Sequence, residues 1–313
     1  MGTEGALVSG RYRLDQPIGR GRAGIVWLAY DTQLNRTVAA KRMYVQQGMP
    51  QAAEVAVQEG RAATRVVHNG AIAVYDVVLD GADPWLVMEF VPSRNMADFL
   101  AEHGGLTPEQ TAFLGIQLAS ALGAAHRAGV LHRSLEPGNV LLADDGGVKI
   151  TDIGIWGAGP NPAFRAPELV KGQPAEPASD AYSLGATLYM AVEGVPPTGE
   201  DGVLRQPQRA GQLTGALMKL LREDPAARPT LADSITAFNA ITQGRQTAFI
   251  PPTAPAMPTV PIAVLNRPLV TAAAPKAPVI TLTPARIRGL ILATLAILCA
   301  AAIGIGVTQL LFL

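Results

Sequence analysis

The sequence has a single cysteine and no excess of charge of either sign. Its 313 residues carry 25 Lys and Arg against 25 Asp and Glu, so no net electrostatic field would draw the chain to nucleic acid. Cys299 has no second cysteine to pair with, which excludes an intrachain disulfide framework and a site built from several thiolates. We therefore expect no nucleic-acid partner, and we interpret Cys299 as a small buried hydrophobic residue.

The first residues of the sequence do not resemble a secretory signal. The first ten residues, MGTEGALVSG, have neither the positively charged start nor the apolar stretch of a secretory signal. We expect residues 1–10 to form a short tail, and the folded part that follows to stay in the cytoplasm.

Composition changes twice along the rest of the chain. From residue 11 to residue 241, apolar residues follow periodic patterns that are typical of a folded domain. Residues 242–285 contain nine prolines and almost no charge, which predicts an extended, disordered linker. Residues 286–313 contain the uncharged stretch GLILATLAILCAAAIGIGVTQLLFL.

This last region predicts a transmembrane helix. A helix rises about 1.5 Å per residue, so a stretch of this length can cross a hydrocarbon core of roughly 30 Å. Arg286 and Arg288 precede the stretch, which itself carries no charge, and this places its N-terminal side in the cytoplasm. We expect a single-pass protein of the cell membrane whose folded domain is cytoplasmic.

Within residues 11–241, a strand-rich part precedes a helical part. Short apolar runs bounded by turn residues predict strands at RYRLDQPIG, AGIVWLAYD, RTVAAKRM, AIAVYDVVL and PWLVMEFV. The stretch AAEVAVQEGRAATRVV predicts a helix between the third and fourth runs, and from Met96 the pattern is mainly helical. The sequence therefore predicts an α+β fold with a small β-sheet lobe and a larger helical lobe.

Two features of the predicted sheet lobe could serve phosphate binding. Gly19, Gly21 and Gly24 lie between two predicted strands, where backbone N–H groups could approach a phosphate without side chains in the way. Alone, this pattern fits an ordinary glycine-rich hairpin better. Lys41 lies inside an apolar strand, where an unpaired ammonium group would be costly. Glu59 in the next helix is its expected partner, with a surface lysine and a solvated glutamate as the alternative.

Two motifs in the predicted helical lobe add further polar residues. Asp152 follows the predicted strand VKI, at a place suited to holding a metal ion against phosphates. The motif HRSLEPGNVLL contains Ser134, Glu136 and Asn139. The order and spacing of all these motifs, more than any one of them, indicate a common function.

Lys41, Glu59, HRSLEPGN, DIG and APE follow one another in an order that resembles the bacterial eukaryotic-like serine/threonine protein kinases, across nearly all of residues 11–241. The resemblance implies the two-lobed protein kinase fold with a nucleotide site. It also implies two architectural roles, in which Asp180 anchors the catalytic loop and Arg228 pairs with Glu168.

The resemblance assigns further residues to the nucleotide pocket. Val26, Ala39 and Leu141 are implied to enclose the adenine, and Met88 to guard the back pocket. The backbone of Glu89 to Val91 is the implied hinge. Asn139 and Asp152 are the implied Mg²⁺ ligands. With the glycines, Lys41 and Glu59, the nucleotide half of the site is complete, which favours binding of ATP with Mg²⁺.

The chain departs from this family at the positions that carry phosphate transfer. Ser134 stands where the kinases place the aspartate that accepts the substrate proton, and loss of a general base typically costs roughly 10²- to 10⁴-fold in rate. Glu136 stands where they place a lysine on the γ-phosphate, which exchanges attraction for repulsion. These departures predict that no catalytic residue set is intact.

The segment from Asp152 to Glu168, DIGIWGAGPNPAFRAPE, is short and contains no Ser, Thr or Tyr. No phosphate can therefore order it, and Arg133 loses the phosphate that is its usual partner in the family. Asn161 stands about where the family has the threonine that contacts the catalytic loop.

Three functions follow from this pattern and stay open at this point. The main hypothesis is a membrane-tethered pseudokinase, a regulatory or scaffolding module that binds ATP without efficient phosphotransfer. The second is a serine/threonine protein kinase with low or atypical activity, and the third is a nucleotide-independent scaffold. ATP binding separates the first from the third, and product formation separates the second from both.

The linker and the membrane segment suggest partners. Thr247 and Thr259 each precede an isoleucine by three residues, similar to phosphothreonine motifs that forkhead-associated domains bind in bacteria with these kinases. We expect an active serine/threonine kinase to phosphorylate them and a forkhead-associated-domain protein to read them, with coincidence as the alternative. Ala296, Ala300 and Gly304 are spaced as in closely packed membrane helices, so a homodimer is a further alternative.

Overall fold

The computed structural model describes residues 3–21, 24–45, 51–155, 161–199 and 202–242. The expected linker beyond Thr242 and the expected transmembrane helix at 286–313 lie outside these residues. In the described part, no helix is both long enough and apolar enough to span a bilayer. The membrane helix therefore stays a prediction.

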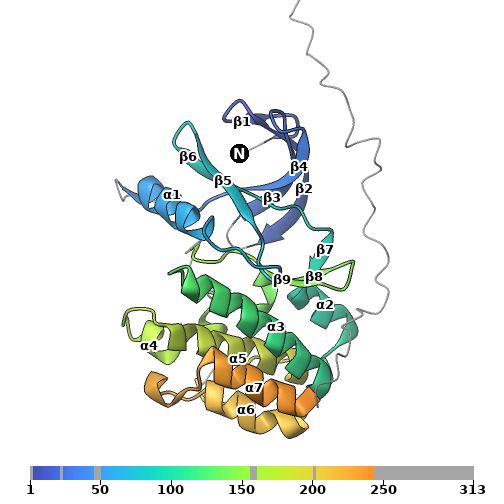
Figure 1. The fold of residues 1–313 in the computed structure, drawn as a ribbon, viewed down its shortest axis with the longest axis vertical. Coiled ribbons are helices and arrows are strands. Elements are labelled where there is room, and N and C mark those ends of the chain that lie inside the picture. Colours follow the sequence, from blue (N-terminus) through green and yellow to red (C-terminus); the bar gives the residue numbers. More distant parts are fainter. Residues whose placement is uncertain (1–2, 22–23, 46–50, 156–160, 200–201, 243–313) are drawn as a thin grey trace, which may run out of the picture. The chain divides into compact units, whose positions relative to one another are not determined.

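The first lobe is a six-stranded sheet with one helix against it (Figure 1). The strand order is β1-β2-β3-β4-β6-β5, and every neighbouring pair is antiparallel. The bounds are β1 Leu7–Val8, β2 Tyr12–Gly21, β3 Gly24–Asp31, β4 Arg36–Arg42, β5 Val74–Asp80 and β6 Asp83–Met88. All five apolar runs that predict strands do contain one.

The sheet separates two apolar clusters because neighbouring residues of a strand point to opposite faces. On β4 and β6, Val38, Ala40, Trp85 and Val87 join one cluster. Their neighbours Ala39, Leu86 and Met88 join the other, which also receives the helix α1. Lys41 is in register with Val26 and with Leu86. The alternation therefore directs Lys41 to the face that carries the helix.

Helix α1, Ala52–Ala63, packs directly on the sheet. It is built from alanine, glutamate and glutamine, which favour helices, and it ends four residues earlier than the periodic pattern predicts. Gly60 permits the close approach, because a Cβ atom there would lie 2.7 Å from Cγ2 of Val77 on β5. The absence of a side chain at this position thus sets how near α1 lies to the sheet.

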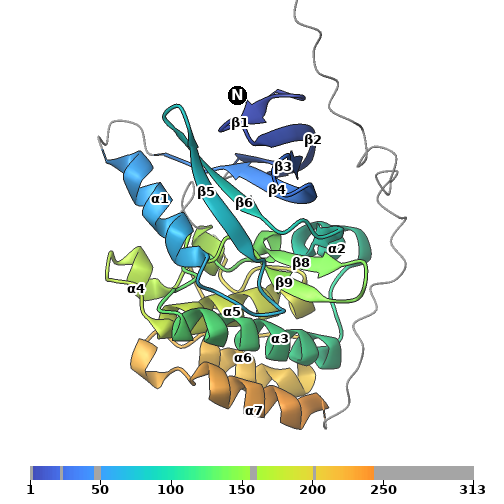
Figure 2. The ribbon, with the colours of Figure 1, turned by 45° about the horizontal axis from the view of Figure 1, so that its top comes forward.

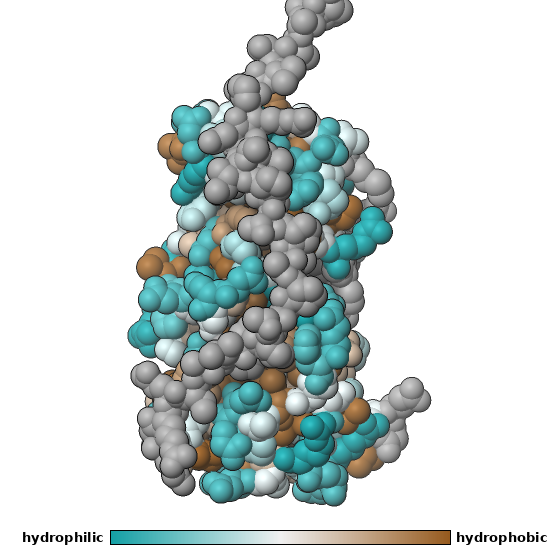
Figure 3. Space-filling view, turned by 90° about the vertical axis from the view of Figure 1, so that its right-hand side faces the viewer, coloured by the Kyte–Doolittle hydropathy of each residue, from teal (hydrophilic) through white to brown (hydrophobic). Residues whose placement is uncertain are grey.

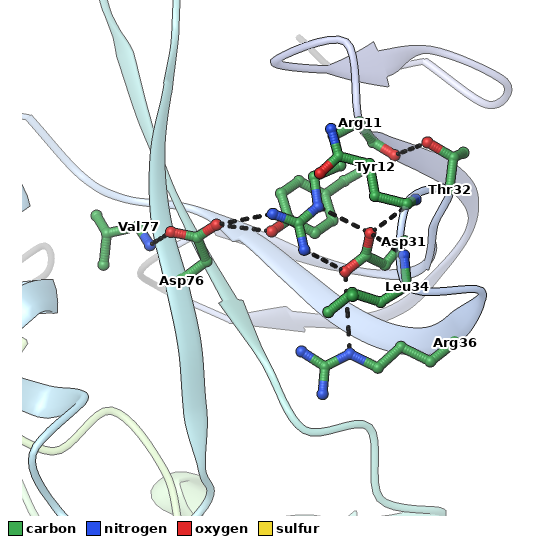
Figure 4. Close-up of polar contacts among 9 residues, drawn as sticks. Arg11, Tyr12, Asp31, Thr32, Leu34, Arg36, Asp76 and Val77 are labelled. Carbon is green, nitrogen blue, oxygen red and sulfur yellow. Dashed lines mark hydrogen bonds and ion pairs between the residues drawn. The ribbon is translucent and has the colours of Figure 1, made fainter.

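A polar network fixes the far end of the sheet (Figure 4). Arg11 donates to both oxygens of the buried Asp31, at 2.8 and 2.7 Å, and this hydrogen bonding lowers the pKa of that carboxyl group. The hydroxyl of Tyr12 donates to Asp76 of β5 at 2.7 Å. The start of β2, the end of β3 and the middle of β5 are thereby tied together.

The second lobe is mainly helical and contains a small three-stranded sheet, β7-β8-β9. Figure 2 shows this sheet between the first lobe and the long helices. The bounds are β7 Ser93–Asn95, α2 Met96–His103, α3 Pro108–Arg127, η1 Pro137–Asn139, β8 Val140–Ala143, β9 Val148–Ile150, η2 Pro162–Phe164, α4 Pro167–Val170, α5 Pro177–Glu193, η3 Gly211–Leu213, α6 Thr214–Leu220, η4 Pro225–Ala227 and α7 Leu231–Thr242.

Helices α3, α5 and α7 hold the core of this lobe. A capping box between Thr107 and Gln110, with Pro108 at the first position, starts α3. Phe238 of α7 is fully buried, and Gly115 of α3 lets its ring approach, because a Cβ atom there would lie 2.8 Å from the ring. Most of α5 is buried, which makes it the central helix.

On the side that Figure 3 shows, the described surface carries both hydrophilic and hydrophobic residues and no single large apolar area. Hydrophilic residues cover both lobes there, and hydrophobic residues lie in small groups between them. Such scattered apolar exposure is normal for a folded domain.

Candidate functional site

The glycine-rich segment forms the hairpin between β2 and β3. Gly19 is in register with Val26, and Gly21 with Gly24, so the three glycines lie where the two strands converge. A Cβ atom on Gly19 would contact only Val26, at 3.8 Å. The structure thus places the predicted glycines in one hairpin, next to the apolar residue that the resemblance assigns to the adenine pocket.

The apolar residues predicted to hold an adenine come together in one cluster. Ala39 and Met88 are buried in it, and the partly buried Val26, Val91 and Leu141 pack against it. These side chains come from β3, β4, β6, the segment after β6, and β8. Ile18 also packs against this cluster. Sequence reasoning did not single out Ile18, although it directly precedes the first glycine of the hairpin.

The segment after β6 connects the lobes, and contacts of Glu89 with Ala73 and Lys149 fix its position. The N–H of Glu89 donates to the carbonyl of Ala73 at 2.8 Å. Its carboxylate accepts from the N–H of Ala73 at 3.0 Å and pairs with Lys149 of β9 at 2.9 Å. No hydrogen bond within the described residues involves the carbonyl of Glu89 or the N–H of Val91. These two backbone groups can therefore serve a ligand, and the Glu89–Lys149 pair fixes the segment that carries them.

The structure corrects the expected partner of Lys41. Its ammonium group lies 2.5 Å from Oδ2 of Asp152, and both side chains are nearly buried, at 8% and 12% exposure. The predicted pairing of Lys41 with Glu59 is wrong for this structure. The expectation that the buried ammonium group of Lys41 needs a carboxylate partner is nevertheless met, because Asp152 provides that carboxylate.

Glu59 is bound by the catalytic loop instead. Nη2 of Arg133 lies 2.9 Å from Oε1 of Glu59, and the same nitrogen donates to the carbonyl of Gly154. Gly154 has a φ of +74°, and a Cβ atom there would lie 2.7 Å from Val130, so only glycine fits. Arg133 therefore connects α1, the catalytic loop and the segment after β9, which sequence reasoning did not foresee.

Asp152 and Asn139 are the residues that could hold a metal ion. Oδ1 of Asp152 is buried and has no hydrogen-bond partner among the described residues, and the residue has a φ of +61°, a conformation that costs energy outside glycine. The amide of Asn139 donates to the carbonyl of Ser134 at 2.8 Å, which fixes its orientation.

The described residues contain no group of three or more His, Cys, Asp or Glu side chains that could hold a metal ion alone. A cation here would need oxygen ligands from another molecule. Mg²⁺ fits this description, because it commonly binds one or two protein groups together with the phosphates of a substrate. The orphaned oxygen of Asp152 is consistent with such a shared site.

The catalytic loop is firmly anchored. Asp180 of α5 accepts from the N–H groups of His132 and Arg133, at 2.8 and 2.7 Å. The ring of His126 lies 2.7 Å from the same carboxylate, a contact that sequence reasoning missed. The implied role of Asp180 is confirmed. Ser134, the residue at the base position, is half-buried in the loop that Asp180 holds.

A second anchor holds the chain beyond the loop. Arg228 donates to both oxygens of Glu168, each at 2.7 Å, and Ser179 donates to one of them at 2.7 Å. Burial alone would raise the pKa of Glu168, but the hydrogen bonds from Arg228 and Ser179 bring it below its ordinary value. The implied pair is confirmed. Asn161 accepts from the N–H of Ala163 and caps η2, which is a local contact.

Comparison with known proteins agrees with this geometry. The family model described as "Protein kinase domain" matches residues 12–239. The chain is 34% identical over 210 residues to the "Probable serine/threonine-protein kinase PknB" of Corynebacterium glutamicum, which covers 61% of this chain and 32% of that protein. It is 31% identical over 278 residues to the serine/threonine-protein kinase PkaA of Streptomyces coelicolor, which covers 76% of this chain and 51% of that protein.

A third relative and a solved structure extend this picture. The serine/threonine-protein kinase PknK of Mycobacterium tuberculosis is 39% identical over 193 residues, which cover 57% of this chain and 17% of that protein. The chain thus spans about half the length of these relatives or less. The crystal structure of the PknI kinase domain of Mycobacterium tuberculosis has a TM-score of 0.68 at 24% identity, and covers 77% of this chain and 99% of that one. This likeness supports the two-lobed fold.

Proposed function

The chain belongs to the protein kinase domain family, and from this premise we propose that it is an ATP-binding regulatory module whose phosphotransfer is weak or absent. The observation that carries the proposal is an unequal site. Lys41 and Asp152 meet at 2.5 Å beside an apolar cluster and a free pair of hinge groups, whereas Ser134 and Glu136 occupy the positions that transfer would need.

The residues of the nucleotide half have separate tasks in this proposal. Val26, Ala39 and Leu141 enclose the adenine, while the carbonyl of Glu89 and the N–H of Val91 provide polar contacts to its edge. Protein kinase domains in general use ATP with Mg²⁺, and bound Mg²⁺ neutralises charge on the phosphates.

Lys41 would bind phosphate oxygens, and Asp152 with Asn139 would hold the metal ion. Each group would then add a ligand contact to the present pair or exchange the pair for one. The orphaned Oδ1 of Asp152 is available for this change.

The catalytic half lacks the corresponding chemistry. The hydroxyl of Ser134 is far too weakly basic to accept a proton from a substrate alcohol near neutral pH. Glu136 places a negative charge where the transferred phosphate would need a positive one. Both defects affect the transfer of phosphate. Nucleotide binding depends on the residues of the other half of the cleft and is not affected by them.

The relatives favour a second candidate function. All three are named as serine/threonine-protein kinases, so a kinase with low or atypical activity is the alternative, with Asp152 and the metal ion acting without a conventional base. A nucleotide-independent scaffold is the third candidate, and the free hinge groups speak against it.

One experiment ranks the three candidates. The melting temperature of the purified full-length chain is measured with and without ATP and Mg²⁺, and transfer of labelled phosphate is measured in parallel. We expect ATP to raise the melting temperature by binding the folded state, and Lys41→Met to remove most of the shift. An unchanged melting curve at millimolar ATP would favour the scaffold.

The transfer assay carries its own control. We expect no transfer to the chain itself or to generic protein substrates. Transfer that Asp152→Ala abolishes would establish the kinase alternative and overturn the pseudokinase proposal, while transfer that survives this substitution points to a contaminating kinase.

Membrane anchoring and the linker threonines belong to the same proposal. We propose that residues 286–313 anchor the chain, with the kinase-like domain in the cytoplasm, and that an active serine/threonine kinase phosphorylates Thr247 or Thr259 for a forkhead-associated-domain protein. Fractionation of cells that express the chain with or without residues 286–313 tests the anchor.

Phosphopeptide mapping tests phosphorylation of the linker threonines, and pull-down with linker peptides tests their binding to a forkhead-associated-domain protein. Phosphates found only in the kinase-like domain would contradict this part of the proposal.

A further inference from the structure

A turn of residues 68–71 lies between α1 and β5, and we call it the α1–β5 turn. The N–H of Ala71 donates to the carbonyl of His68 at 3.0 Å and closes the turn. The carbonyl of Gly70 accepts from the N–H of Ile150 of β9 at 2.8 Å, and Ala71 pairs with Ile150 as an isolated parallel bridge. The backbone of the turn is thus bonded to the helical lobe.

The side chain of His68 adds a second connection between this turn and the helical lobe. Its Nδ1 lies 3.0 Å from the backbone nitrogen of Gly70, and its Nε2 lies 3.1 Å from the hydroxyl oxygen of Ser120 on α3. Gly70 packs closely against the ring, because a Cβ atom there would lie 3.2 Å from Nδ1 and 3.4 Å from the Cβ atom of Ala121. One imidazole ring therefore contacts both the turn and α3.

These two contacts define the protonation state of the ring. A backbone N–H can only donate, so Nδ1 of His68 is the unprotonated nitrogen that accepts from Gly70. Nε2 then carries the proton and donates to Ser120. A second proton would have to bind Nδ1, where it would face the N–H of Gly70. The closed turn therefore fits the neutral ring and does not fit the charged one.

The charges around the ring also oppose its protonation. Arg127 at the end of α3 and Lys149 of β9 are the charged side chains that act on His68, and both are positive. Lys149 is itself paired with Glu89 at 2.9 Å, and Arg65, which follows α1, is an exposed cation. Burial of the ring, together with Arg127 and Lys149, lowers the pKa of His68 below its ordinary value of 6.5. The ring is therefore neutral in the closed turn at neutral pH.

From this geometry we infer that His68 makes a pH-sensitive contact, which holds the α1–β5 turn on the helical lobe when the ring is neutral and loosens the turn when the ring is protonated. The inference does not depend on ATP binding. An open turn accepts the proton that the closed turn excludes, so the closed form is fully favoured above about pH 6.5 and becomes less favoured as the pH falls. For one proton, the change is limited to about tenfold per pH unit.

Hydrogen exchange of the full-length chain measures the opening of the turn. Protection factors, which correct for the effect of pH on intrinsic exchange, are followed by mass spectrometry in peptides that cover residues 66–72 and 148–151. Helix α5 is buried and reports unfolding of the whole domain, so lower protection of the turn than of α5 identifies local opening. We expect the protection of the turn to fall by roughly tenfold between about pH 7.5 and pH 5.5 while it stays below that of α5.

His68→Asn separates the titration from the contact. The oxygen of an asparagine side chain accepts from the backbone N–H two residues on and does not titrate. We therefore expect the turn of this variant to stay protected at about pH 7.5 and to lose the tenfold dependence on pH. An equal fall in the wild type and in His68→Asn would overturn the inference.

Two further variants serve as controls. Ser120→Ala removes the contact with α3 and leaves the bond between Nδ1 and Gly70, so it should lower the protection of the turn at every pH and keep the dependence on pH. His103→Asn changes an exposed histidine of α2 and should alter neither the protection of the turn nor its dependence on pH. Loss of the pH dependence in His103→Asn would contradict the assignment to His68.

A second measurement observes the ring itself. Nitrogen chemical shifts of isotope-labelled histidine distinguish the two tautomers and the charged ring, and the signal that is missing from His68→Asn belongs to His68. We expect Nε2 to carry the only proton at about pH 7.5, and the second proton to bind below about pH 6.5 together with the loss of protection. A proton on Nδ1 at about pH 7.5, or a charged ring in a turn that stays protected, would overturn the inference.

Discussion

Two regions of this molecule are built from the same kinds of charged residue and differ in how completely these residues are bonded. In the helical lobe, all five N–H donors of Arg228 have acceptors, two of them on Glu168 and the others on the carbonyls of Ala178, Arg222 and Glu223. In the cleft, Lys41 has one bond to one oxygen of Asp152, and the second oxygen has no partner among the described residues.

The difference shows what fixes the partner of a charged side chain. At Arg228 and Glu168 every competing arrangement would lose several hydrogen bonds at once, with the two side chains only 0% and 4% exposed. In the cleft, the pair of Lys41 with Asp152 rests on a single hydrogen bond. A fully bonded pair therefore supports the fold, whereas an incompletely bonded one can respond to a ligand.

The largest expected effect comes from breaking the anchor. Glu168→Gln removes the charge and leaves the guanidinium group of Arg228 buried without a counter-ion, which should lower the free energy of unfolding by about 3–5 kcal/mol. Urea denaturation of the full-length chain measures it. The exposed pair provides the control, since Lys171→Gln should leave the midpoint unchanged. A small loss for Glu168→Gln would mean that the anchor is not needed for stability.

The second prediction concerns the packing that positions Glu59. Gly60→Ala places a Cβ atom 2.7 Å from Val77 and 3.3 Å from Leu86, so α1 must move away from the sheet. We expect a loss of about 1–3 kcal/mol in the free energy of unfolding, although alanine favours a helix more than glycine does.

Gly123→Ala on α3 is the matched control for this substitution. A Cβ atom there would meet only the flexible end of Arg127, at 3.5 Å, so the helical preference of alanine should stabilise the chain by up to about 1 kcal/mol. Opposite signs for the two glycines are the expected result. A gain for Gly60→Ala would contradict the close packing of α1 on β5.

The same comparison explains which parts of the fold and of the site can be predicted from the sequence. The two lobes and their strands follow from apolar periodicity, whereas the Glu168–Arg228 pair and the anchoring role of Asp180 follow only from the resemblance to the serine/threonine protein kinases. The apolar residues that the resemblance assigns to the nucleotide pocket, Val26, Ala39, Met88 and Leu141, lie in one cluster, while nucleotide binding stays a prediction. α1 ends earlier than its periodicity suggests, because the chain continues in turns closed by the N–H of Arg65 on Ala62 and the N–H of Val66 on Ala63.

The partner of Lys41 could not be predicted in the same way. The resemblance places Lys41, Glu59, Arg133 and Asp152 in one cleft, but motif order does not say which of the two cations pairs with which carboxylate. That pairing depends on backbone angles such as the positive φ of Arg133 and Asp152, which arginine seldom adopts and which aspartate adopts at only some positions. The Glu89–Lys149 pair was missed for the same reason, as its partners are sixty residues apart.

The third prediction uses pH to distinguish the anchored loop from the cleft. His132 is fully buried, and neither ring nitrogen makes a hydrogen bond of normal geometry within the described residues. Burial lowers its pKa below the ordinary value of 6.5. Between these two values the unfolded chain holds a proton that the folded chain does not, so stability should fall as pH drops below about 6.5.

His132→Phe should flatten this acid limb without a large loss at pH 8. Each proton taken up only on unfolding contributes a slope of about 1.4 kcal/mol per pH unit. Part of the slope should persist, because burial, with Arg127 and Lys149 nearby, also lowers the pKa of His68. Urea midpoints between pH 5 and pH 8 measure the change, and an unaltered slope in the variant would show that His132 takes no part.

The smallest expected effect is that of restoring an aspartate at the base position. The loop around Ser134 is held by Asp180 and by the Asn139 amide, which binds the backbone carbonyl of Ser134 and not its hydroxyl. Ser134→Asp should therefore leave the unfolding midpoint nearly unchanged. It should also leave phosphate transfer undetected, because Glu136 still repels the phosphate and the stretch after Asp152 still has no residue to phosphorylate. Labelled-phosphate transfer by Ser134→Asp and by Ser134→Asp with Glu136→Lys checks this. Strong activity of the single variant would show that the missing base alone separates this chain from an active kinase, and that the cleft is otherwise complete.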